Sequence, residues 1–237
     1  MRYLALDFET GNASPLSACA LGASVFEDNQ LVDEKISLIR PPECVGRFHW
    51  GNVRVNHIKE NMVQDAPSFA SFWRELAPLA EGSVLVAHNA MFDTGVLCAC
   101  LAHYGLPMPE CRYVCTVKVS QRVWPDLANH KLDTVSDYLG ITLDHHEAGS
   151  DARAAGLILQ AALRETGAAD ADVLADSEAL VEALMDADVL ADSLALVEAL
   201  MDADVLADSL ALVEALMEAL VLADSLALVE ALIDADV

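Results

Sequence analysis

The sequence predicts an α/β domain in which helices cover a β-sheet, followed by an all-α tail. Strand patterns joined by a turn signal predict a hairpin near the N-terminus, and further strand patterns then alternate with helical ones. The composition changes near residue 168, so we expect a first domain over residues 1–167 and a separate segment over 168–237. A chain of 237 residues has room for both.

Three strands are predicted at the start of the chain: Arg2–Phe8, Ala20–Phe26 and Leu31–Ile39. The polar stretch Glu27–Gln30 lies between the second and the third and predicts a tight turn. The third strand ends at Arg40-Pro41-Pro42, because proline cannot donate a hydrogen bond to a β-ladder. Residues 43–66 show no clear periodicity and are expected to form a long loop with short helical pieces.

Helices and strands then alternate up to residue 167. The predicted strands are Ser83–Ala87 and Tyr113–Cys115, and the predicted helices are Ser68–Leu79, Ala90–Tyr104, Val117–Val123, Leu132–Leu139 and Ser150–Arg164. Pro67 suits the start of the first of these helices, and Gly105-Leu106-Pro107 ends the second.

Residues 168–237 contain a unit of 16 residues that begins at Asp170 and recurs at 186–201, 202–217 and, in altered form, 218–233. They carry 18 acidic residues and no basic one. On a helix, the large apolar side chains of one unit fall within an arc of about 160°, which predicts an amphipathic helix. The apolar face shifts by roughly 160° from one unit to the next. Either the helix therefore breaks between units and turns back, or one long helix exposes apolar faces on both sides and needs a partner to cover them. The alternatives for the tail are an expanded repeat without a role, an interaction or oligomerisation module, and an acidic segment that mimics nucleic acid or collects metal ions.

Composition excludes several classes of protein. A net charge of −25 argues against binding of nucleic acid through bulk positive charge. The chain has no apolar stretch of about 18 residues, so no membrane span is expected. Its N-terminus lacks the apolar core of a signal peptide, and its six cysteines include no Cys-x-x-Cys pair, which disfavours a zinc site. We therefore expect a cytoplasmic protein with reduced thiols.

Four carboxylates stand where predicted strands end or helices begin. Asp7 and Glu9 are two residues apart on the first strand, so their side chains point to the same side. Asp93 follows a buried strand, and Asp151 lies near the start of the last helix of the domain. Carboxylates that gather in this way favour bound cations, and an all-oxygen set suits Mg²⁺ or Mn²⁺. Two such ions about 3.5 to 4 Å apart can promote phosphodiester cleavage.

The segments around these carboxylates resemble the motifs of the DEDDh (DnaQ-like) 3′-5′ exonucleases, a family that includes the proofreading epsilon subunit of bacterial DNA polymerase III and ribonuclease T. The resemblance covers about residues 1–166. The related subfamily with tyrosine would need that residue at position 147, where this chain has Glu147. The matches are Asp-x-Glu-Thr at Asp7, Glu9 and Thr10, His-Asn-x-x-Phe-Asp at His88, Asn89, Phe92 and Asp93, and His-x4-Asp at His146 and Asp151.

The resemblance implies a ribonuclease H-like fold with a mixed five-stranded sheet and helices on both faces. It also implies that Asp7, Glu9, Asp93 and Asp151 hold two Mg²⁺ (or Mn²⁺) ions, with His146 as the general base. The product would be a nucleoside 5′-monophosphate. The residues implied in substrate binding are Phe8, Thr10, His88, Asn89 and Phe92. An alternative for His88 and Asn89 is that they hydrogen-bond the loop that positions Asp93, and Asp144 and Glu147 are expected to be solvated.

The expected partner is the 3′ end of a single strand of DNA or RNA, which needs only local positive charge and stacking. A DNA polymerase and a second copy of the chain are further candidate partners, through a proofreading-type role and a homodimer. The alternatives are an exoribonuclease that trims RNA or oligonucleotides, and a non-catalytic scaffold that acts through the repeat tail. Basic and aromatic residues are expected to flank the cleft, unless they are merely scattered over the surface: Arg40, Arg47, His49, Trp50, Arg54, His57, Lys59, Lys118, Arg122, Lys131 and Arg153.

Overall fold

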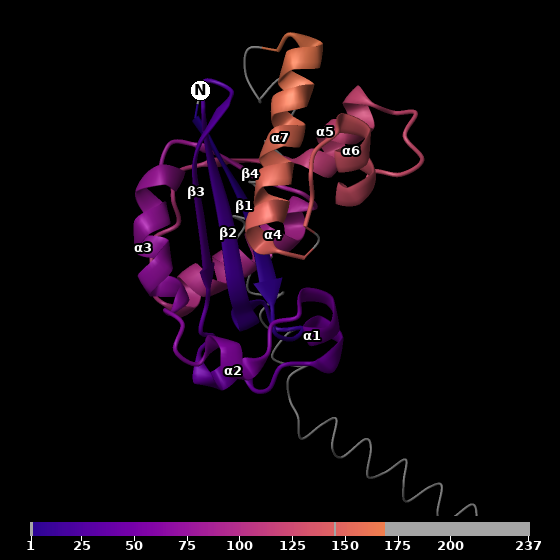
Figure 1. The fold of residues 1–237 in the computed structure, drawn as a ribbon. Coiled ribbons are helices and arrows are strands. Elements are labelled where there is room, and N and C mark those ends of the chain that lie inside the picture. Colours follow the sequence, from indigo (N-terminus) through magenta and orange to yellow (C-terminus); the bar gives the residue numbers. More distant parts are fainter. Residues whose placement is uncertain (1, 145, 169–237) are drawn as a thin grey trace, which may run out of the picture. The chain divides into compact units, whose positions relative to one another are not determined.

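The computed structural model describes residues 2–144 and 146–168, and these contain a five-stranded sheet with the strand order β3-β2-β1-β4-β5 (Figure 1). β2 is antiparallel to both of its neighbours, whereas β1, β4 and β5 run parallel. The predicted mixed sheet is therefore confirmed. The strands are β1 (Arg2–Thr10), β2 (Ala18–Glu27), β3 (Gln30–Leu38), β4 (Val84–Ala87) and β5 (Arg112–Cys115).

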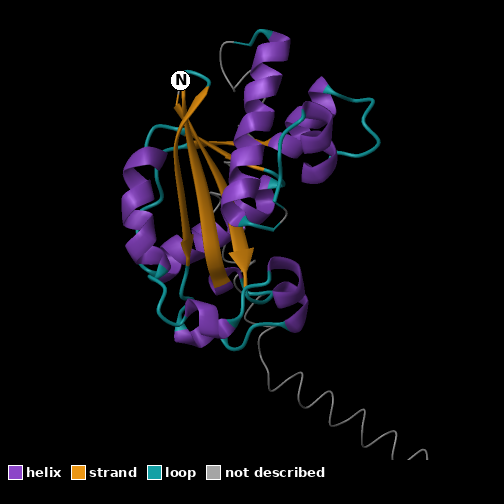
Figure 2. Cartoon of the chain, viewed as in Figure 1, coloured by secondary structure: helices purple, strands orange, loops and turns teal. Residues whose placement is uncertain are grey.

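Helices cover both faces of the sheet (Figures 1 and 2). The α3/α4 face is covered by α3 (Phe69–Ala80) and α4 (Ala90–His103). The α7 face is covered by α5 (Thr116–Val123), α6 (Leu132–Leu139) and α7 (Ala148–Thr166). The long loop of the prediction contains two short helices, α1 (Trp50–Asn56) and α2 (Glu60–Val63), and 3-10 turns occur at Pro15–Ser17 and Glu43–Val45.

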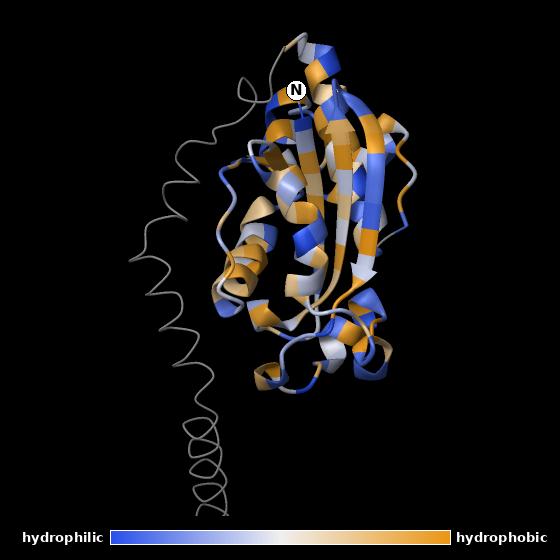
Figure 3. Cartoon of the chain, turned by 90° about the vertical axis from the view of Figure 1, so that its left-hand side faces the viewer, coloured by the Kyte–Doolittle hydropathy of each residue, from blue (hydrophilic) through white to orange (hydrophobic). Residues whose placement is uncertain are grey.

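Alternation along β1 divides its side chains between two hydrophobic cores. Leu4, Leu6 and Phe8 join the core under α3 and α4, whereas Tyr3 and Ala5 join the core under α7. In Figure 3 the inner strands are mainly hydrophobic, whereas edge strand β3 contains many hydrophilic residues among its hydrophobic ones. This agrees with the exposure of much of β3 to solvent. The same alternation places the side chains of residues 7 and 9 on the α7 face, at the end of a buried strand.

The hairpin between β2 and β3 turns at Asp28 and Asn29, where the sequence predicts a turn. Both residues have positive φ, 48° and 59°, as a two-residue hairpin turn requires. The Tyr3 hydroxyl donates a 2.9 Å hydrogen bond to Asn29 Oδ1, and Gln160 Nε2 donates one of 2.7 Å to the Asn29 carbonyl. The turn is thereby tied to β1 and to α7.

The first turn of α7 rests directly on the sheet at Gly22 of β2. Gly22 pairs with Asp7 across the β1–β2 ladder, and a Cβ atom placed on it would lie 2.0 Å from the backbone carbonyl oxygen of Ala148. Only glycine permits this approach. The contact places the start of α7, and with it Asp151, over the end of β1.

Residue 145 and the repeat segment 169–237 lie outside the described residues, so the predicted helical tail and the domain boundary at residue 167 stay predictions. Within the described residues, no helix combines the length and the apolar character that crossing a membrane requires.

The close approach at Gly22 makes a prediction about stability. Gly22→Ala is expected to lower the free energy of unfolding by roughly 1–3 kcal/mol, because the added methyl group meets backbone that cannot move aside freely. The matched control is Gly95→Ala on α4, where an added Cβ has no neighbour within 4 Å and alanine favours the helix by about 1 kcal/mol. Chemical denaturation followed by tryptophan fluorescence measures both, and equal effects would contradict the proposed contact.

Candidate active site

Acidic side chains from three separate segments meet at the end of β1. One ligand atom each of Glu9, His146 and Asp151 lie within 4.8 Å of one another, and no other group of three such residues occurs among the described positions. Asp93 reaches the same strand end, since its Oδ1 accepts a 2.9 Å hydrogen bond from the Phe8 backbone N–H. Asp7 is close enough to Asp93 and Asp151 for their negative charges to raise its pKa further. The structure thus brings together all five residues whose catalytic or metal-binding roles the sequence predicts.

Asp93 is placed by the start of α4. Asn89 caps this helix in the left-handed conformation, with φ of 68°, and its carbonyl accepts a hydrogen bond from the Phe92 backbone N–H. Asp93 then falls in the first turn of the helix, where only 4% of the residue is exposed. Its bond to the Phe8 N–H links α4 to β1 one residue before Glu9.

His146 lies in the loop that leads into α7. Its φ of 62° is in the left-handed region, which is uncommon for a residue other than glycine. The His146 backbone N–H donates a 3.2 Å hydrogen bond to Asp151 Oδ2, so one carboxylate of the site fixes the backbone of its histidine. The residue is exposed, so its imidazole is accessible to solvent.

Two asparagines of α1 hold the end of β1, and sequence reasoning missed both. Asn52 Nδ2 donates hydrogen bonds of 3.1 and 3.2 Å to the carbonyl and hydroxyl oxygens of Thr10. Asn56 Nδ2 donates one of 3.1 Å to the same carbonyl, and this residue is only 6% exposed. The available signal was a pair of amide side chains four residues apart, which lie on one face of a helix. The segment lacks apolar periodicity, so the sequence predicts short helical pieces there but not the bounds of this helix.

Burial dominates the electrostatics of the site. It raises the pKa of Asp7 well above the usual range, and the neighbouring charges of Asp93 and Asp151 add to the effect. Burial also raises the pKa of Glu9 to about 7, although a hydrogen bond from Asn56 opposes the shift. The pKa of Asp93 rises to about 8 for the same principal reason, against the hydrogen bond from Phe8. The carboxylates therefore cannot all ionise near neutral pH without a compensating positive charge.

This donor set fits divalent cations. The oxygen atoms come from carboxylates, the ligands that Mg²⁺ and Mn²⁺ prefer. Burial raises the pKa of Asp7, Glu9 and Asp93, and neighbouring carboxylates add to the effect, so a cation would stabilise the ionised groups. Asp7, Glu9, Asp93 and Asp151 are the residues that would hold such ions.

Two of the residues expected to bind substrate have other positions. The Phe8 side chain is 2% exposed and packs 6.3 Å from the Phe69 ring, so it belongs to the core and offers no surface to a nucleotide. The His88 ring is engaged at both nitrogens, since Nε2 donates to the His130 carbonyl at 3.0 Å and Nδ1 accepts from the Thr116 hydroxyl at 2.9 Å. Burial lowers the pKa of His88 to about 4, which keeps the ring neutral. The Phe8 side chain is therefore not available to a nucleotide, and for His88 the contacts favour the alternative of a structural role, in which it holds the ends of neighbouring segments together.

Thr10 and Phe92 do border an open space. A hollow of about 360 Å³ lies between the loop after β1, α1 and the start of α4. Phe92 is 46% exposed, and Met91 beside it is exposed as well. Asn89 is also exposed at the cap of α4. The hollow is lined by Thr10, Asn12, Ala13, Ser14, Pro15, Asn52, Met91, Phe92, Gly95 and Val96.

Five of the expected basic residues fall into two groups. Arg47, Arg54 and Lys59 are exposed in the segment of α1 and α2 that is bonded to Thr10. Arg153 instead forms an ion pair of 3.3 Å with Glu34 on β3, and Arg40 Nη1 donates to the Gln64 carbonyl.

Comparisons with known proteins agree with this geometry. The exonuclease family model RNase_T matches residues 4–159. The chain is 28% identical over 166 residues to a DNA polymerase III PolC-type of Lacticaseibacillus paracasei, and 30% identical over 161 residues to the 3′-5′ exonuclease DinG of Bacillus subtilis. These alignments cover 69% and 66% of this chain but only 11% and 17% of the two relatives, so the chain corresponds to a small part of each.

Solved structures show the same fold. Exonuclease X in complex with 5′ overhanging duplex DNA superposes with a TM-score of 0.57 at 23% identity, over 73% of this chain and 99% of that one. Exonuclease I of E. coli in complex with a dT13 oligonucleotide gives a TM-score of 0.62 at 14% identity, over 70% of this chain and 42% of that one.

The raised pKa values predict how stability depends on pH. Glu9 and Asp93 bind protons more tightly in the folded than in the unfolded chain, so folding is favoured at low pH and loses this contribution as the pH rises from about 4 to about 8. Without divalent cations, the Tm is expected to fall by on the order of 5 °C between pH 5 and pH 8. Asp7→Asn should reduce this fall, because it removes one of the interacting charges, and Mg²⁺ should raise the Tm more at pH 8 than at pH 5.

Differential scanning calorimetry at several pH values measures these shifts. The control is Glu75→Gln on the exposed side of α3, which should leave the pH dependence unchanged. A wild-type Tm that stays constant or rises over this interval, with the same profile in Asp7→Asn, would contradict the electrostatic description of the site.

Proposed function

The chain belongs to the exonuclease family of the RNase_T model, and on this premise we propose that it is a metal-dependent 3′-5′ exonuclease that acts on single-stranded DNA. The observation that carries the proposal is the convergence of Glu9, His146 and Asp151 within 4.8 Å, beside the half-buried Asp7 and the buried Asp93. Such a concentration of acidic groups costs stability and is retained in proteins where it binds cations.

Asp7, Glu9, Asp93 and Asp151 are proposed to hold two Mg²⁺ or Mn²⁺ ions. Bound divalent cations would supply the positive charge that lowers the pKa of a water molecule and stabilises the transferring phosphate and the leaving oxygen. The protein keeps the carboxylates in place before substrate arrives: Asn56 bonds the end of β1, and the Phe8 N–H orients Asp93. This preorganisation means that little rearrangement is needed during the reaction.

His146 is proposed to be the general base. Its exposed imidazole accepts a proton from the attacking water, whose oxygen forms a new bond to the phosphorus atom of the last internucleotide phosphate. The bond from that phosphorus to the 3′ oxygen of the preceding nucleotide breaks, and this oxygen takes a proton from solvent. The products are a nucleoside 5′-monophosphate and a strand that is one nucleotide shorter.

The hollow next to Thr10 is proposed to receive the terminal nucleotide. Its volume of about 360 Å³ lies within the range of small-molecule sites, and the exposed Phe92 ring offers a surface on which a base can stack. Thr10 and Phe92 are next in sequence to Glu9 and Asp93, so we expect the phosphate of a nucleotide in the hollow to lie toward the carboxylates. Arg47, Arg54 and Lys59 are suitably exposed for the phosphates of the preceding nucleotides.

Several relatives support DNA as the substrate. The solved complexes of Exonuclease I and Exonuclease X contain DNA, and the relatives named DNA polymerase III PolC-type support an association with a polymerase. An RNA-trimming activity at the same site is the second candidate, and parallel assays on DNA and RNA of equal sequence decide between them. Light scattering measures whether a homodimer forms.

Removal of single site residues should abolish cleavage. With a 5′-labelled single strand and Mg²⁺, wild-type protein is expected to produce a ladder of products shortened from the 3′ end. Asp7→Asn and Asp151→Asn should reduce this to background, and His146→Ala should lower kcat by roughly 100- to 10,000-fold, as loss of a general base does. Glu75→Gln is the control, because that carboxylate is exposed on α3 and is not one of the site residues.

The proposal fails if the wild-type protein leaves DNA and RNA intact in both Mg²⁺ and Mn²⁺. It also fails if Asp7→Asn and Asp151→Asn cleave as fast as the wild type.

The terminal-nucleotide hollow makes a separate prediction. Phe92→Ala should raise KM for a single-stranded oligonucleotide about tenfold, which is the loss expected for one base stacked on an aromatic ring. Val32→Ala on β3 removes a comparably exposed apolar side chain, 53% against 46%, and should leave KM unchanged. Steady-state kinetics on both variants test this, and equal KM values for Phe92→Ala and the wild type would exclude the hollow as the binding site.

A further inference from the structure

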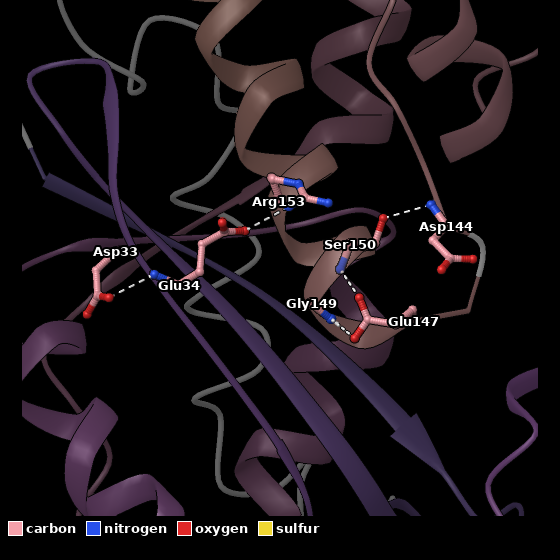
Figure 4. A network of polar contacts seen from close by, with 7 residues as sticks. All are labelled: Asp33, Glu34, Asp144, Glu147, Gly149, Ser150 and Arg153. Atoms are coloured by element: carbon pink, nitrogen blue, oxygen red, sulfur yellow. Dashed lines mark hydrogen bonds and ion pairs between the residues drawn. The ribbon is translucent and has the colours of Figure 1, made fainter.

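Three hydrogen-bonding arrangements fasten the loop around His146 to the first turn of α7. The Asp144 backbone N–H donates a 2.8 Å hydrogen bond to Ser150 Oγ, and the His146 backbone N–H donates to Asp151 Oδ2. The Glu147 carboxylate folds back over the helix start and accepts from the backbone N–H groups of Gly149 and Ser150, at 3.2 and 2.8 Å (Figure 4). The expectation that Asp144 and Glu147 are merely solvated is therefore corrected for Glu147, which is the N-cap of α7.

Glu147 is an unusual residue for this position, since serine, threonine, aspartate and asparagine are the preferred N-caps. Both of its oxygens are used, and they satisfy two N–H groups that the helix itself leaves without partners. A negative charge is also favourable at the start of a helix of 19 residues. Glu147 stands at the position where the tyrosine-containing subfamily places its tyrosine, so the same position carries a structural role in this chain.

The helix that Glu147 caps is itself held against the sheet. Its first turn rests on Gly22 of β2, and one turn later Arg153 pairs with Glu34 of β3 (Figure 4). The start of α7 is thus held in place by the sheet. Glu147 joins this fixed helix start to His146, the residue that precedes Glu147 in the sequence.

The His146 side chain depends on this connection. The residue is exposed and adopts a left-handed backbone conformation, with φ of 62°. The surrounding structure must enforce such a conformation, because the chain otherwise prefers a negative φ. The bond from the His146 N–H to Asp151 fixes the backbone on one side, and the Glu147 cap fixes it on the other.

We propose that Glu147 is a positioning residue for His146, and that it acts by capping α7 rather than by its charge or by contact with the substrate. This inference rests on the proposed function, in which His146 is the general base. It predicts that any side chain able to cap the helix can replace Glu147, whether or not that side chain is charged.

Three variants of the full chain separate these possibilities. Glu147→Ala removes the cap, Glu147→Ser keeps a capping oxygen without the charge, and Ser68→Ala removes the N-cap of α3, whose Oγ accepts from the Ser71 N–H at 3.3 Å. Glu147→Ala should lower kcat roughly 10- to 100-fold, as misplacement of a reacting group does, with KM within about twofold of the wild type. Ser68→Ala should lower the Tm by about as much as Glu147→Ala does, because each removes one helix N-cap, but it should leave kcat unchanged. Glu147→Ser should restore most of kcat.

A spectroscopic measurement gives a readout that is independent of activity. In the proton NMR spectrum, the imidazole C–H signal of His146 is assigned by its absence in His146→Gln. This signal is expected to shift or broaden in Glu147→Ala and to keep its wild-type position in Ser68→Ala and Glu147→Ser. If the wild type cleaves no oligonucleotide but this pattern is seen, the positioning role stands and the proposed function falls.

Other outcomes overturn the positioning role. Unchanged kcat and an unchanged His146 signal in Glu147→Ala would show that the cap is not needed. Failure of Glu147→Ser to restore kcat, with its Tm at the wild-type value, would show that Glu147 acts through its charge. Equal losses of kcat in Ser68→Ala and Glu147→Ala would show that the effect is one of general stability.

Discussion

At the end of β1, burial and mutual repulsion make it costly for Asp7, Glu9 and Asp93 to carry negative charge together. Much of the nearby structure serves to hold these groups in place despite that cost. Asn52 and Asn56 bond the strand end, the Phe8 N–H holds Asp93, and the absence of a side chain at Gly22 lets α7 bring Asp151 within reach. A site of this kind is less stable without cations than with them, and this difference is the physical basis of its proposed metal dependence.

Much of the fold followed from the sequence because its signals are local. The apolar runs and the turn residues Asp28 and Asn29 located the hairpin, and Leu132–Leu139 was predicted with the bounds that α6 has. Short helical pieces were expected in residues 43–66, but the bounds of α1 could not be predicted because polar contacts stabilise it. Its inward-facing residues Asn52 and Asn56 bond a strand more than forty positions away in the sequence, so no apolar pattern marks it.

The site was predictable in composition but not in detail. The alternation of Asp7 and Glu9 placed both on one side of the strand, and that same rule put Phe8 on the opposite side, in the core. The spacing of His146 and Asp151 suggested the pair, but it could not show that Glu147 caps the helix between them, since glutamate has little preference for that position. The role of His88 depends on Thr116 and His130, which are distant in sequence and meet only in the folded chain.

The central claim is that these carboxylates form one cation-binding centre, and the most direct test is the stoichiometry of Mn²⁺ binding. Mn²⁺ binding is measured by equilibrium dialysis, in parallel, for the wild type and for an Asp7→Asn/Asp151→Asn variant. Both proteins carry the 18 acidic residues of the tail, so weak binding by the tail cancels when the two results are subtracted. The account predicts that the wild type binds two more equivalents of Mn²⁺ than the variant. Equal binding by the two proteins, with both of them folded, would contradict it.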